Sequence, residues 1–285
     1  MKLIGKIIFS GKITTETGLH IGGSKSSLAI GGIDNNVIKS AKGQPYIPGS
    51  SLKGKLRSLL ARAEGSLFFS TDSKEKEIKY VKEQMGKVNK NDKEVLERNL
   101  KIIDQPNNTD QDFTHIMELF GYSGDADIKD INSTRLLVRD AFLANEDDSI
   151  FLDGYTQSKW ENVINRRTGT AEHPRQMERV PKGSAFEYEI VYNIFSDAVQ
   201  HDLQKLNHHI KCIAMALKLL QNDGLGGQIS RGYGKVSISN NKPRLKMITL
   251  ADGRIDGYGD MELANDLNMD TTHLLNEISG QLPQA

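Results

Sequence analysis

The sequence predicts an α+β fold in which helices cover one face of an antiparallel sheet. Three observations point to it: an alternating apolar strand at the start, two segments of helical apolar spacing, and further alternating segments between and after them. The chain has 285 residues, which suffices for one large domain or two small ones.

Strands are expected over residues 2–15, 134–143 and 185–195, with a closing strand that begins at Val236. In the first of these, the odd positions form an apolar face and the even positions are mostly polar and basic. The apolar members are Leu3, Ile7, Phe9 and Ile13. A sheet with one buried and one wet face is typical of an open α+β sandwich.

Two strong helices are expected. The first begins at Ser50 or Ser51, either of which is a good N-cap, and the second covers residues 197–222 and ends at Gly224. Both show apolar residues at steps of three and four. A shorter helix is expected over 113–122. The order strand, helix, strands, helix, strand fits a ferredoxin-like core, the fold of RNA-recognition modules.

Two segments differ from this core of residues 1–240. Residues 71–112 are rich in Lys and Glu, helical between 74 and 103, and are expected to form an inserted charged lobe or, alternatively, a solvated helix pair. Residues 241–285 are expected to form a polar C-terminal extension with a short helix over 263–278.

Composition excludes several protein classes. Lys plus Arg equals Asp plus Glu at 37 each, which argues weakly against a uniformly basic nucleic-acid coat. The single cysteine, Cys212, rules out an internal disulfide and a CxxC metal site, and it favours a reducing cytoplasm. No apolar run is long enough to span a membrane, and no secretory leader is expected.

The start of the first helix is a candidate phosphate site. Lys53 and Arg57 lie four residues apart and share a face, with Lys55 nearby. Cations at a helix N-terminus oppose the helix dipole, whereas an anion there is stabilised by the dipole, the free N–H groups and the hydroxyls of Ser50 and Ser51. A solvated polar face is the alternative.

A glycine loop, residues 224–234, is the second candidate. It follows a helix and lacks a Gly-Lys-Ser/Thr ending, so it is neither a dinucleotide fingerprint nor a P-loop. Its glycines allow close approach of a ligand, its arginine can grip phosphate and its tyrosine can stack on a base; the alternative is a flexible connector. The candidate RNA-binding residues are Gly226, Gly227, Ser230, Arg231 and Tyr233.

The most arginine-dense segment, residues 160–182, is the third candidate. Arginines on an extended hairpin suit contact with nucleic-acid backbones, although a solvated loop is the alternative. Its basic residues are Arg166, Arg167, Arg175, Arg179 and Lys182.

His20 and Asp34 form the fourth candidate. Asp34 lies between a glycine pair and Asn35, so it is either a turn residue or a carboxylate that orients a divalent metal or a ribose hydroxyl. His20 either donates to a phosphate or caps a turn. The sequence contains no HExxH or CxxC motif and no grouped catalytic triad.

Four segments together resemble the RAMP superfamily and, within it, the backbone subunits of type III-A (Csm) CRISPR complexes. These segments are Thr-Gly-Leu-His-Ile-Gly-Gly at 17–23, Gly-Ile-Asp at 32–34 with the run from Ile47 to Arg57, Arg-Asp-Ala at 139–141 with 161–166 and 174–181, and the glycine loop. The full set, in this order, is specific to the type III backbone group.

The resemblance implies a ferredoxin-like palm with an extended thumb hairpin over 155–185. It implies copies stacked along a guide RNA, with Asp34 as the catalytic residue and as a candidate ligand of Mg²⁺ or Mn²⁺. The 2′-hydroxyl would attack the target RNA beside each nucleotide displaced by a thumb. Further implied partners are the complementary target RNA, a large polymerase-like subunit, a small helical subunit and capping RAMP subunits.

Three features depart from the family pattern: the 71–112 insertion, the 241–285 tail, and His173 where asparagine is expected. Three hypotheses remain open on the residues. The chain is an RNA-guided ribonuclease subunit, a non-catalytic guide-RNA-binding filament subunit, or a RAMP endonuclease that processes precursor guide RNA through His20.

Overall fold

The computed structural model describes residues 3–23, 35–64, 97, 114–121, 134–145, 148–152, 154–195, 203–251 and 254–262. The chain divides into two compact units, one made of Met1–Leu59 with Leu136–Ala285 and the other of Leu60–Arg135. In the described residues, no helix is both long and apolar enough to cross a membrane.

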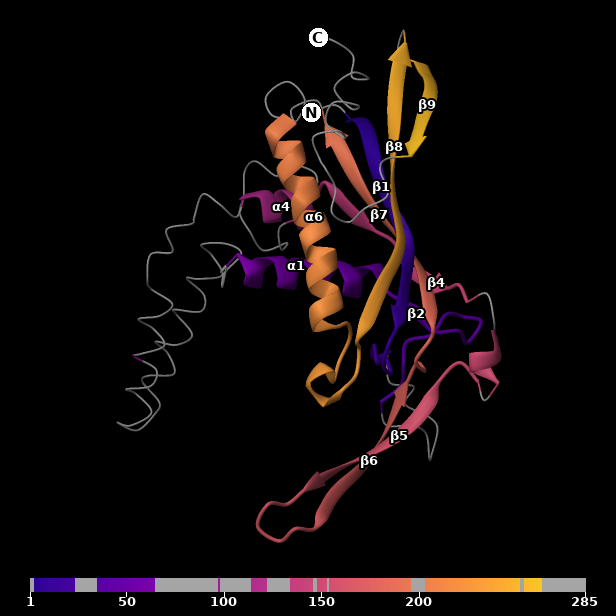
Figure 1. Cartoon of the computed structure of the whole chain (residues 1–285), viewed down its shortest axis with the longest axis vertical. Coiled ribbons are helices and arrows are strands. Elements are labelled where there is room, and N and C mark those ends of the chain that lie inside the picture. The colour runs from indigo at the N-terminus through magenta and orange to yellow at the C-terminus, as the bar shows by residue number, and fades with distance from the viewer. Residues whose placement is uncertain are drawn as a thin grey trace. The chain divides into compact units, whose positions relative to one another are not determined.

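The first unit is built on a seven-stranded antiparallel sheet (Figure 1). Its strand order is β2-β4-β7-β1-β8-β9, and β3 also pairs with β7. The strands are β1 (Leu3–Thr15), β2 (Tyr46–Ile47), β3 (Leu136–Val138), β4 (Ala141–Leu143), β7 (Ala185–Phe195), β8 (Val236–Ala251) and β9 (Arg254–Glu262).

Two helices complete the ferredoxin-like core: α1 (Gly49–Ala63) after the first strand and α6 (Leu203–Asp223) before β8. Taking β3 and β4 as one broken strand, the chain order β1-α1-β3/β4-β7-α6-β8 gives the spatial order fourth-first-third-second that this split βαβ fold requires. The predicted fold class is therefore confirmed.

Apolar periodicity explains the core. The odd residues Ile7, Phe9 and Ile13 of β1 are fully buried, as their alternation predicts. The α6 helix lies along the sheet (Figure 1) and buries one face, with Leu206, Ile210, Ile213, Leu217 and Leu220 all at most 2% exposed. His209 on this face is also buried, and its Nδ1 lies 2.9 Å from the Tyr192 hydroxyl.

Two predicted segments differ from the structure. The single strand expected over 134–143 is two short strands, because the register against β7 shifts by one residue between Val138 and Phe142. The segment after Asn240 continues β8 as far as Ala251 and pairs with β9. The expected helix at 263–278 lies outside the described residues.

The second unit contains the end of α1, the short helix α4 (Thr114–Phe120) and Arg135. Gly121 follows α4 with φ 88°, and its N–H donates to the Met117 carbonyl, which confirms the predicted C-cap. Arg135 is 1% exposed, and its Nε lies 3.7 Å from the Glu118 carboxylate. The predicted charged insertion, 71–112, lies outside the described residues except for Glu97.

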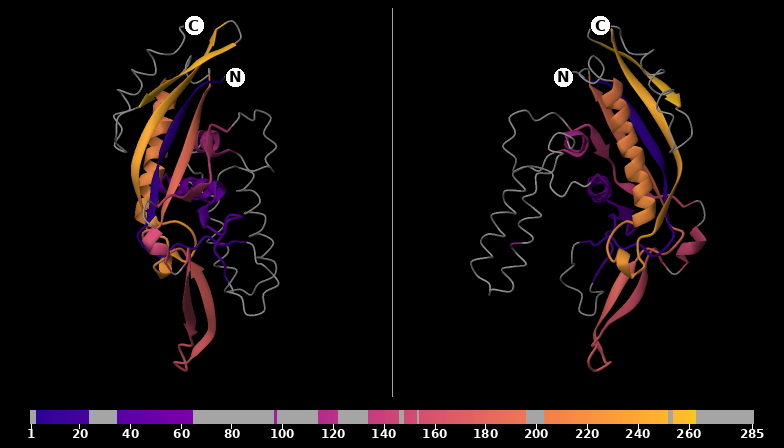
Figure 2. Two further views of the ribbon diagram at one scale, coloured as in Figure 1. Left: turned by 90° about the vertical axis from the view of Figure 1, so that its right-hand side faces the viewer. Right: turned by 60° about the vertical axis from the view of Figure 1, so that its left-hand side comes forward.

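The predicted thumb is an extended two-stranded hairpin between β4 and β7, made of β5 (Gln157–Ile164) and β6 (Ala171–Arg179). It projects away from the sheet in both views of Figure 2. Two 3₁₀ turns flank its base, Asp148–Phe151 before β5 and Ile229–Arg231 in the glycine loop.

Candidate nucleic-acid interface

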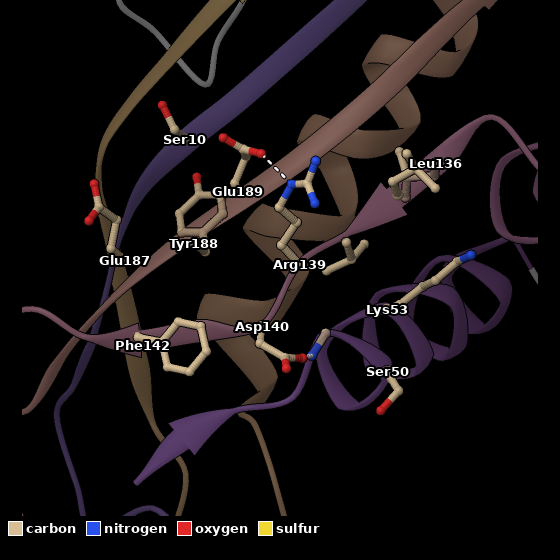
Figure 3. A pocket seen from close by; sticks show the side chains of 13 residues that line it. Ser10, Ser50, Lys53, Leu136, Arg139, Asp140, Phe142, Glu187, Tyr188 and Glu189 are labelled. Atoms are coloured by element: carbon tan, nitrogen blue, oxygen red, sulfur yellow. Dashed lines mark hydrogen bonds and ion pairs between the residues drawn. The ribbon is translucent and has the colours of Figure 1, made fainter. Parts of the chain in front are cut away.

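The start of α1 is held by a residue from far along the chain. The Gly49 N–H donates to the Asp140 carboxylate at 2.7 Å (dashed line in Figure 3). A side chain at Gly49 would overlap the Val138 carbonyl, so glycine permits this close approach. The prediction that Ser50 or Ser51 caps the helix is wrong: both lie inside the first turn, and Asp140 supplies the cap.

A cavity of about 900 Å³ lies between the start of α1 and the sheet (Figure 3). Ser50, Lys53 and Arg139 contribute polar and basic groups to its lining, and Glu187 and Glu189 from β7 contribute acidic ones. Arg139 is mostly exposed, and its Nε donates to the Glu189 carboxylate at 2.6 Å. The lining therefore combines two cations and a hydroxyl, which can bind phosphate, with three carboxylates, of which Asp140 caps α1 and Glu189 pairs with Arg139.

Lys53 and Arg57 share a face of α1 and are both partly buried. Burial lowers the pKa of the Lys53 ammonium, and the nearby positive charge of Arg57 lowers it further. Burial also lowers the pKa of Arg57. An anion at this face would relieve both effects, because it would attract each cation and offset the repulsion between them.

Lys55 does not join this pair. Residue 55 lies about 200° around the helix from residue 53, since successive residues are about 100° apart. Its ammonium forms an ion pair with Asp223 at the end of α6. The predicted RNA contact of Lys55 therefore does not fit the structure, where this cation links two helices.

The glycine loop packs against the segment that contains His20. The Gly227 N–H donates to the His20 carbonyl at 2.8 Å, and the Gly234 N–H donates to the Gly18 carbonyl at 2.9 Å. Gly226 has φ 78°, and a side chain there would overlap the His20 carbonyl. The close approach that glycine allows at residue 226 is thus to the protein's own backbone, rather than to a ligand as predicted.

The predicted stacking of a base on Tyr233 is wrong. The ring is 2% exposed and lies between Lys159 and Arg179, whose charged groups are 4.8 Å and 5.7 Å from its centre. Its hydroxyl donates to the Glu161 carboxylate at 2.9 Å. Burial, together with the bond to Glu161, raises the pKa of the Tyr233 hydroxyl. Tyr233 is a structural contact between the loop and the thumb.

The Glu161 carboxylate forms ion pairs with several cations at the base of the thumb. Its carboxylate lies 3.3 Å from Arg175, 3.5 Å from Arg231 and 3.7 Å from Lys159. Burial alone would raise the pKa of this carboxyl, but the hydrogen bonds from Tyr233 and Arg175 and the nearby positive charges lower it overall. We call Lys159, Glu161, Arg175, Arg231 and Tyr233 the Glu161 cluster.

Other predicted RNA-binding residues lie at the surface. Arg166 and Arg167 form the exposed tip of the thumb, where the Arg167 N–H donates to the Asn165 side chain at 2.9 Å. Ser230 is exposed, and Arg231 is half exposed despite its ion pair. Arg179 is partly buried above Tyr233. The structure thus brings these residues together into two groups, one at the thumb tip and one at its base.

His20 is nearly buried, and its Nδ1 donates to the Glu178 carbonyl at 2.7 Å. A carbonyl only accepts, so this bond fixes the proton on Nδ1. At least the Nδ1 side of the ring therefore has a structural role. Asp34 itself lies outside the described residues, which resume at Asn35.

The residues flanking Asp34 bear on a metal site. The carboxylate of Glu178 in β6 contacts the segment that follows Asp34, and it already accepts bonds from Val37, Lys39 and Thr156. Glu178 is therefore unsuited to hold a cation. A single carboxylate such as Asp34, together with phosphate oxygens of RNA, matches the way in which Mg²⁺ is usually bound in nucleic-acid enzymes.

Sequence reasoning missed four residues of this surface: Arg139, Glu161, Glu178 and the exposed Trp160 of β5. The two acids carried a signal, because each lies within the most arginine-dense segment of the chain. An acidic residue among arginines often marks an internal ion pair.

Comparison with known proteins agrees with this architecture. The model of the RAMP superfamily matches residues 12–237. The endoribonuclease Csm3 of the CRISPR system Cms from Streptococcus thermophilus is 40% identical over 240 residues, covering 83% of this chain and 89% of the relative. The protein of the same name from Methanocaldococcus jannaschii is 35% identical over 270 residues, covering 94% and 92%.

A solved structure agrees as well. The crystal structure of the Csm3–Csm4 subcomplex in the type III-A CRISPR–Cas interference complex contains a chain that is 25% identical, with a TM-score of 0.53 and full coverage of both chains. The family model covers most of the sequence, and the relatives match over nearly their whole length. The chain therefore belongs to the RAMP superfamily and, within it, to the Csm3 family of type III-A CRISPR systems.

Proposed function

We propose that the chain is a repeated backbone subunit of a type III RNA-guided interference complex, where it binds guide RNA and cleaves complementary target RNA. The observation that carries the RNA-binding part is the pair Lys53 and Arg57, two partly buried cations one turn apart on α1, of which Lys53 lines a cavity together with Arg139. Such a pair is stabilised by phosphate. The relatives' name, endoribonuclease, supports the cleavage part.

The thumb supplies the second contact. Its tip carries the exposed Arg166 and Arg167, and β5 presents Trp160 at 66% exposure with Val163 and Ile164 also exposed. Arginine binds phosphate, and an exposed indole stacks on bases without regard to their sequence. A hairpin with this composition is suited to enter a guide–target duplex and displace a nucleotide.

Asp34 is the proposed catalytic residue. The target's 2′-hydroxyl gives up its proton to solvent as its oxygen attacks the adjacent phosphorus, and the bond from phosphorus to the 5′-oxygen breaks. The leaving 5′-oxygen takes up a proton from solvent, so the products are a 2′,3′-cyclic phosphate and a 5′-hydroxyl. The Asp34 carboxylate would orient the 2′-hydroxyl and hold a divalent cation, Mg²⁺ or Mn²⁺. When bound, that cation supplies positive charge at the scissile phosphate.

Assembly follows from the same proposal. Copies of the chain would stack along one guide RNA, together with a large polymerase-like subunit, a small helical subunit and capping RAMP subunits. We place the complex in the cytoplasm, in keeping with the single cysteine, Cys212, which is buried and forms no disulfide.

The test is cleavage of target RNA by the assembled complex carrying Asp34→Ala, with Mg²⁺ and with chelator. We expect regular cuts in the wild type with Mg²⁺, and none in the variant or with chelator, while guide RNA is retained throughout. Asp223→Asn is the matched control, since it removes a carboxylate of the same type that pairs with Lys55 on the outside of the molecule. Unchanged cuts in Asp34→Ala would leave a non-catalytic guide-binding filament subunit.

Processing of precursor guide RNA through His20 is disfavoured. The histidine is nearly buried, and one of its two ring nitrogens is held by the Glu178 carbonyl. Incubation of the isolated subunit with precursor RNA in the presence of chelator checks this alternative, and we expect no cleavage.

A further inference from the structure

The segment that carries Asp34 is closed at its base by a short backbone ladder. The Gly23 N–H donates to the Asn36 carbonyl at 3.0 Å, and the Ile38 N–H donates to the Ile21 carbonyl at 2.9 Å. Gly22 and Val37 form an antiparallel bridge between these bonds. Residues 23 and 36 are therefore held side by side, and Asp34 precedes residue 36 by two positions in the sequence.

The thumb strand β6 runs alongside this ladder. Asn35 bridges Met177 in parallel, and the Glu178 N–H donates to the Asn35 carbonyl at 3.1 Å. On the other side, the Glu178 carbonyl accepts the bond from His20. The backbone of Glu178 thus joins both the segment before the Asp34 loop and the segment after it.

The Glu178 side chain adds a second set of bonds to the same place. It is 4% exposed, and its carboxylate accepts from the Val37 N–H at 2.8 Å, from Lys39 at 2.5 Å and from the Thr156 hydroxyl at 2.5 Å. Burial would raise the pKa of this carboxyl, but the three donors lower it overall. The carboxylate is therefore ionised at neutral pH and fully used within the protein.

The Glu178 side chain links the thumb to the segment that follows Asp34. On the thumb side, Glu178 lies in β6 and its partner Thr156 directly precedes β5. On the other side, its partners Val37 and Lys39 lie a few residues beyond Asp34. We infer that Glu178 is a positioning residue for cleavage, which fixes the Asp34 loop to the base of the thumb so that the position of the thumb on the RNA sets the position of Asp34. This inference rests on the proposed function of Asp34.

The consequence is a cleavage site at a fixed distance from the displaced nucleotide. Bonds that involve charged groups and are shielded from water are the strong ones, so this joint resists movement of the loop relative to the thumb. Misplacement of a catalytic group by about 1 Å costs on the order of 100-fold in rate. Loosening the joint should therefore slow the chemical step and leave binding of either RNA intact.

The test is Glu178→Gln in the assembled complex. Glutamine keeps the shape but turns an NH₂ group toward one of the three donors, so at least one bond is lost. We expect the single-turnover cleavage rate at saturating target to fall about 10-fold or more. Guide-RNA content and target-RNA affinity should stay within about twofold of wild type, and the concentration of Mg²⁺ at half-maximal rate should rise.

Glu16→Gln is the matched control: the same chemical change breaks the exposed Lys235 ion pair, and we expect the wild-type rate. Thr156→Val is the second variant, because it removes a single bond from the thumb side and should assemble even if Glu178→Gln does not. We expect it to slow cleavage several-fold and to raise the Mg²⁺ requirement in the same direction.

The outcomes separate the two proposals. Suppose that Asp34→Ala is inactive, whereas Thr156→Val, and Glu178→Gln if it assembles, cleave at the wild-type rate. This result supports the role of Asp34 and overturns the role of Glu178. Loss of target affinity in parallel with rate would also overturn it, because that pattern marks a merely structural residue. Active Asp34→Ala would overturn both proposals together.

Discussion

The cations of the palm, by which we mean Lys53 and Arg57 on α1 of the ferredoxin-like core, and those at the base of the thumb lie in opposite electrostatic environments. At the palm, burial and mutual repulsion lower the pKa of Lys53, and burial lowers that of Arg57. At the base of the thumb, Arg175 and Arg231 surround Glu161, whose own pKa is lowered by the hydrogen bonds and charges around it. The first group places two like charges close together on one helix face, and the second surrounds a carboxylate.

This difference suggests two roles: the cations of the palm bind RNA, and those at the base of the thumb stabilise the protein. A cation that the protein itself neutralises contributes to stability, whereas one held beside another cation contributes when RNA arrives. The sequence alone predicts RNA binding for all of these cations, because the residue type does not distinguish an RNA contact from an internal ion pair. The comparison predicts that variants in the two regions will change different measured quantities.

The largest effect is expected from Glu161→Gln, which weakens the charged hydrogen bonds to Tyr233 and Arg175. We expect the free energy of unfolding to fall by about 2 kcal/mol, because such bonds are strong and shielded. Urea denaturation of the isolated subunit measures this change. Guide-RNA affinity should stay within about twofold, and a fall of tenfold or more without loss of stability would break the comparison.

The loss of stability in Glu161→Gln should depend on pH, and its direction follows from the pKa of Glu161. Because the folded-state pKa of Glu161 is lowered, its stabilising contribution is present above the pKa of the unfolded chain. It is lost as the pH falls through the folded-state pKa. The difference in unfolding free energy between wild type and Glu161→Gln should therefore be constant near neutral pH and shrink in acid. A difference that grows in acid would contradict the assignment.

A smaller effect with the opposite character is expected from Lys53→Met at the palm. We expect guide-RNA affinity to fall about 10-fold and the slope of log affinity against log salt to become less steep by about 0.7, the value for one phosphate contact to a single strand. Stability should be unchanged or slightly higher, since the variant removes a partly buried charge.

Lys55→Met is the control for Lys53→Met. It lies two residues away on the same helix, but its ammonium pairs with Asp223. We expect wild-type guide affinity and a loss of stability below about 1 kcal/mol, typical of an ion pair near the surface. Filter binding with a guide-length RNA at several salt concentrations compares the two variants. Equal losses of affinity would show that the ion pair opens for RNA.

The sequence predicts the fold well where a local period decides it. The alternation in β1 and β7 places these strands within a residue of their observed ends, and the helical spacing places the end of α6 equally well. The predicted start of that helix, 197–202, lies outside the described residues. Composition marks residues 160–182 and Asp34 only as candidates with a bland alternative, and the thumb and the catalytic assignment of Asp34 come from the resemblance.

What could not be predicted depends on contacts between distant residues. Asp140 caps α1 from 91 residues away, although two local serines were good caps. Tyr233 is buried because Glu161, 72 residues away, accepts its hydroxyl. Lys55 pairs with Asp223, 168 residues away, on the side of α1 that faces away from Lys53. In each case the local pattern allowed two roles, and the tertiary structure selected one.

The smallest expected effect comes from Gly54→Ala, and it tests how closely RNA approaches the palm. Gly54 lies exposed inside α1, where glycine costs about 1 kcal/mol relative to alanine, and nothing lies within 4 Å of the position that a Cβ would take. We therefore expect the free energy of unfolding to rise by about 1 kcal/mol. The fold gives no reason for a glycine here, so we expect guide-RNA affinity to fall by a few-fold, because an added methyl would separate the RNA backbone from the helix beside Lys53. Urea denaturation and filter binding measure the two changes on one protein. A gain in stability with unaltered affinity would mean that only the tips of the palm side chains reach the guide, and the contrast with the thumb would then depend on charge alone.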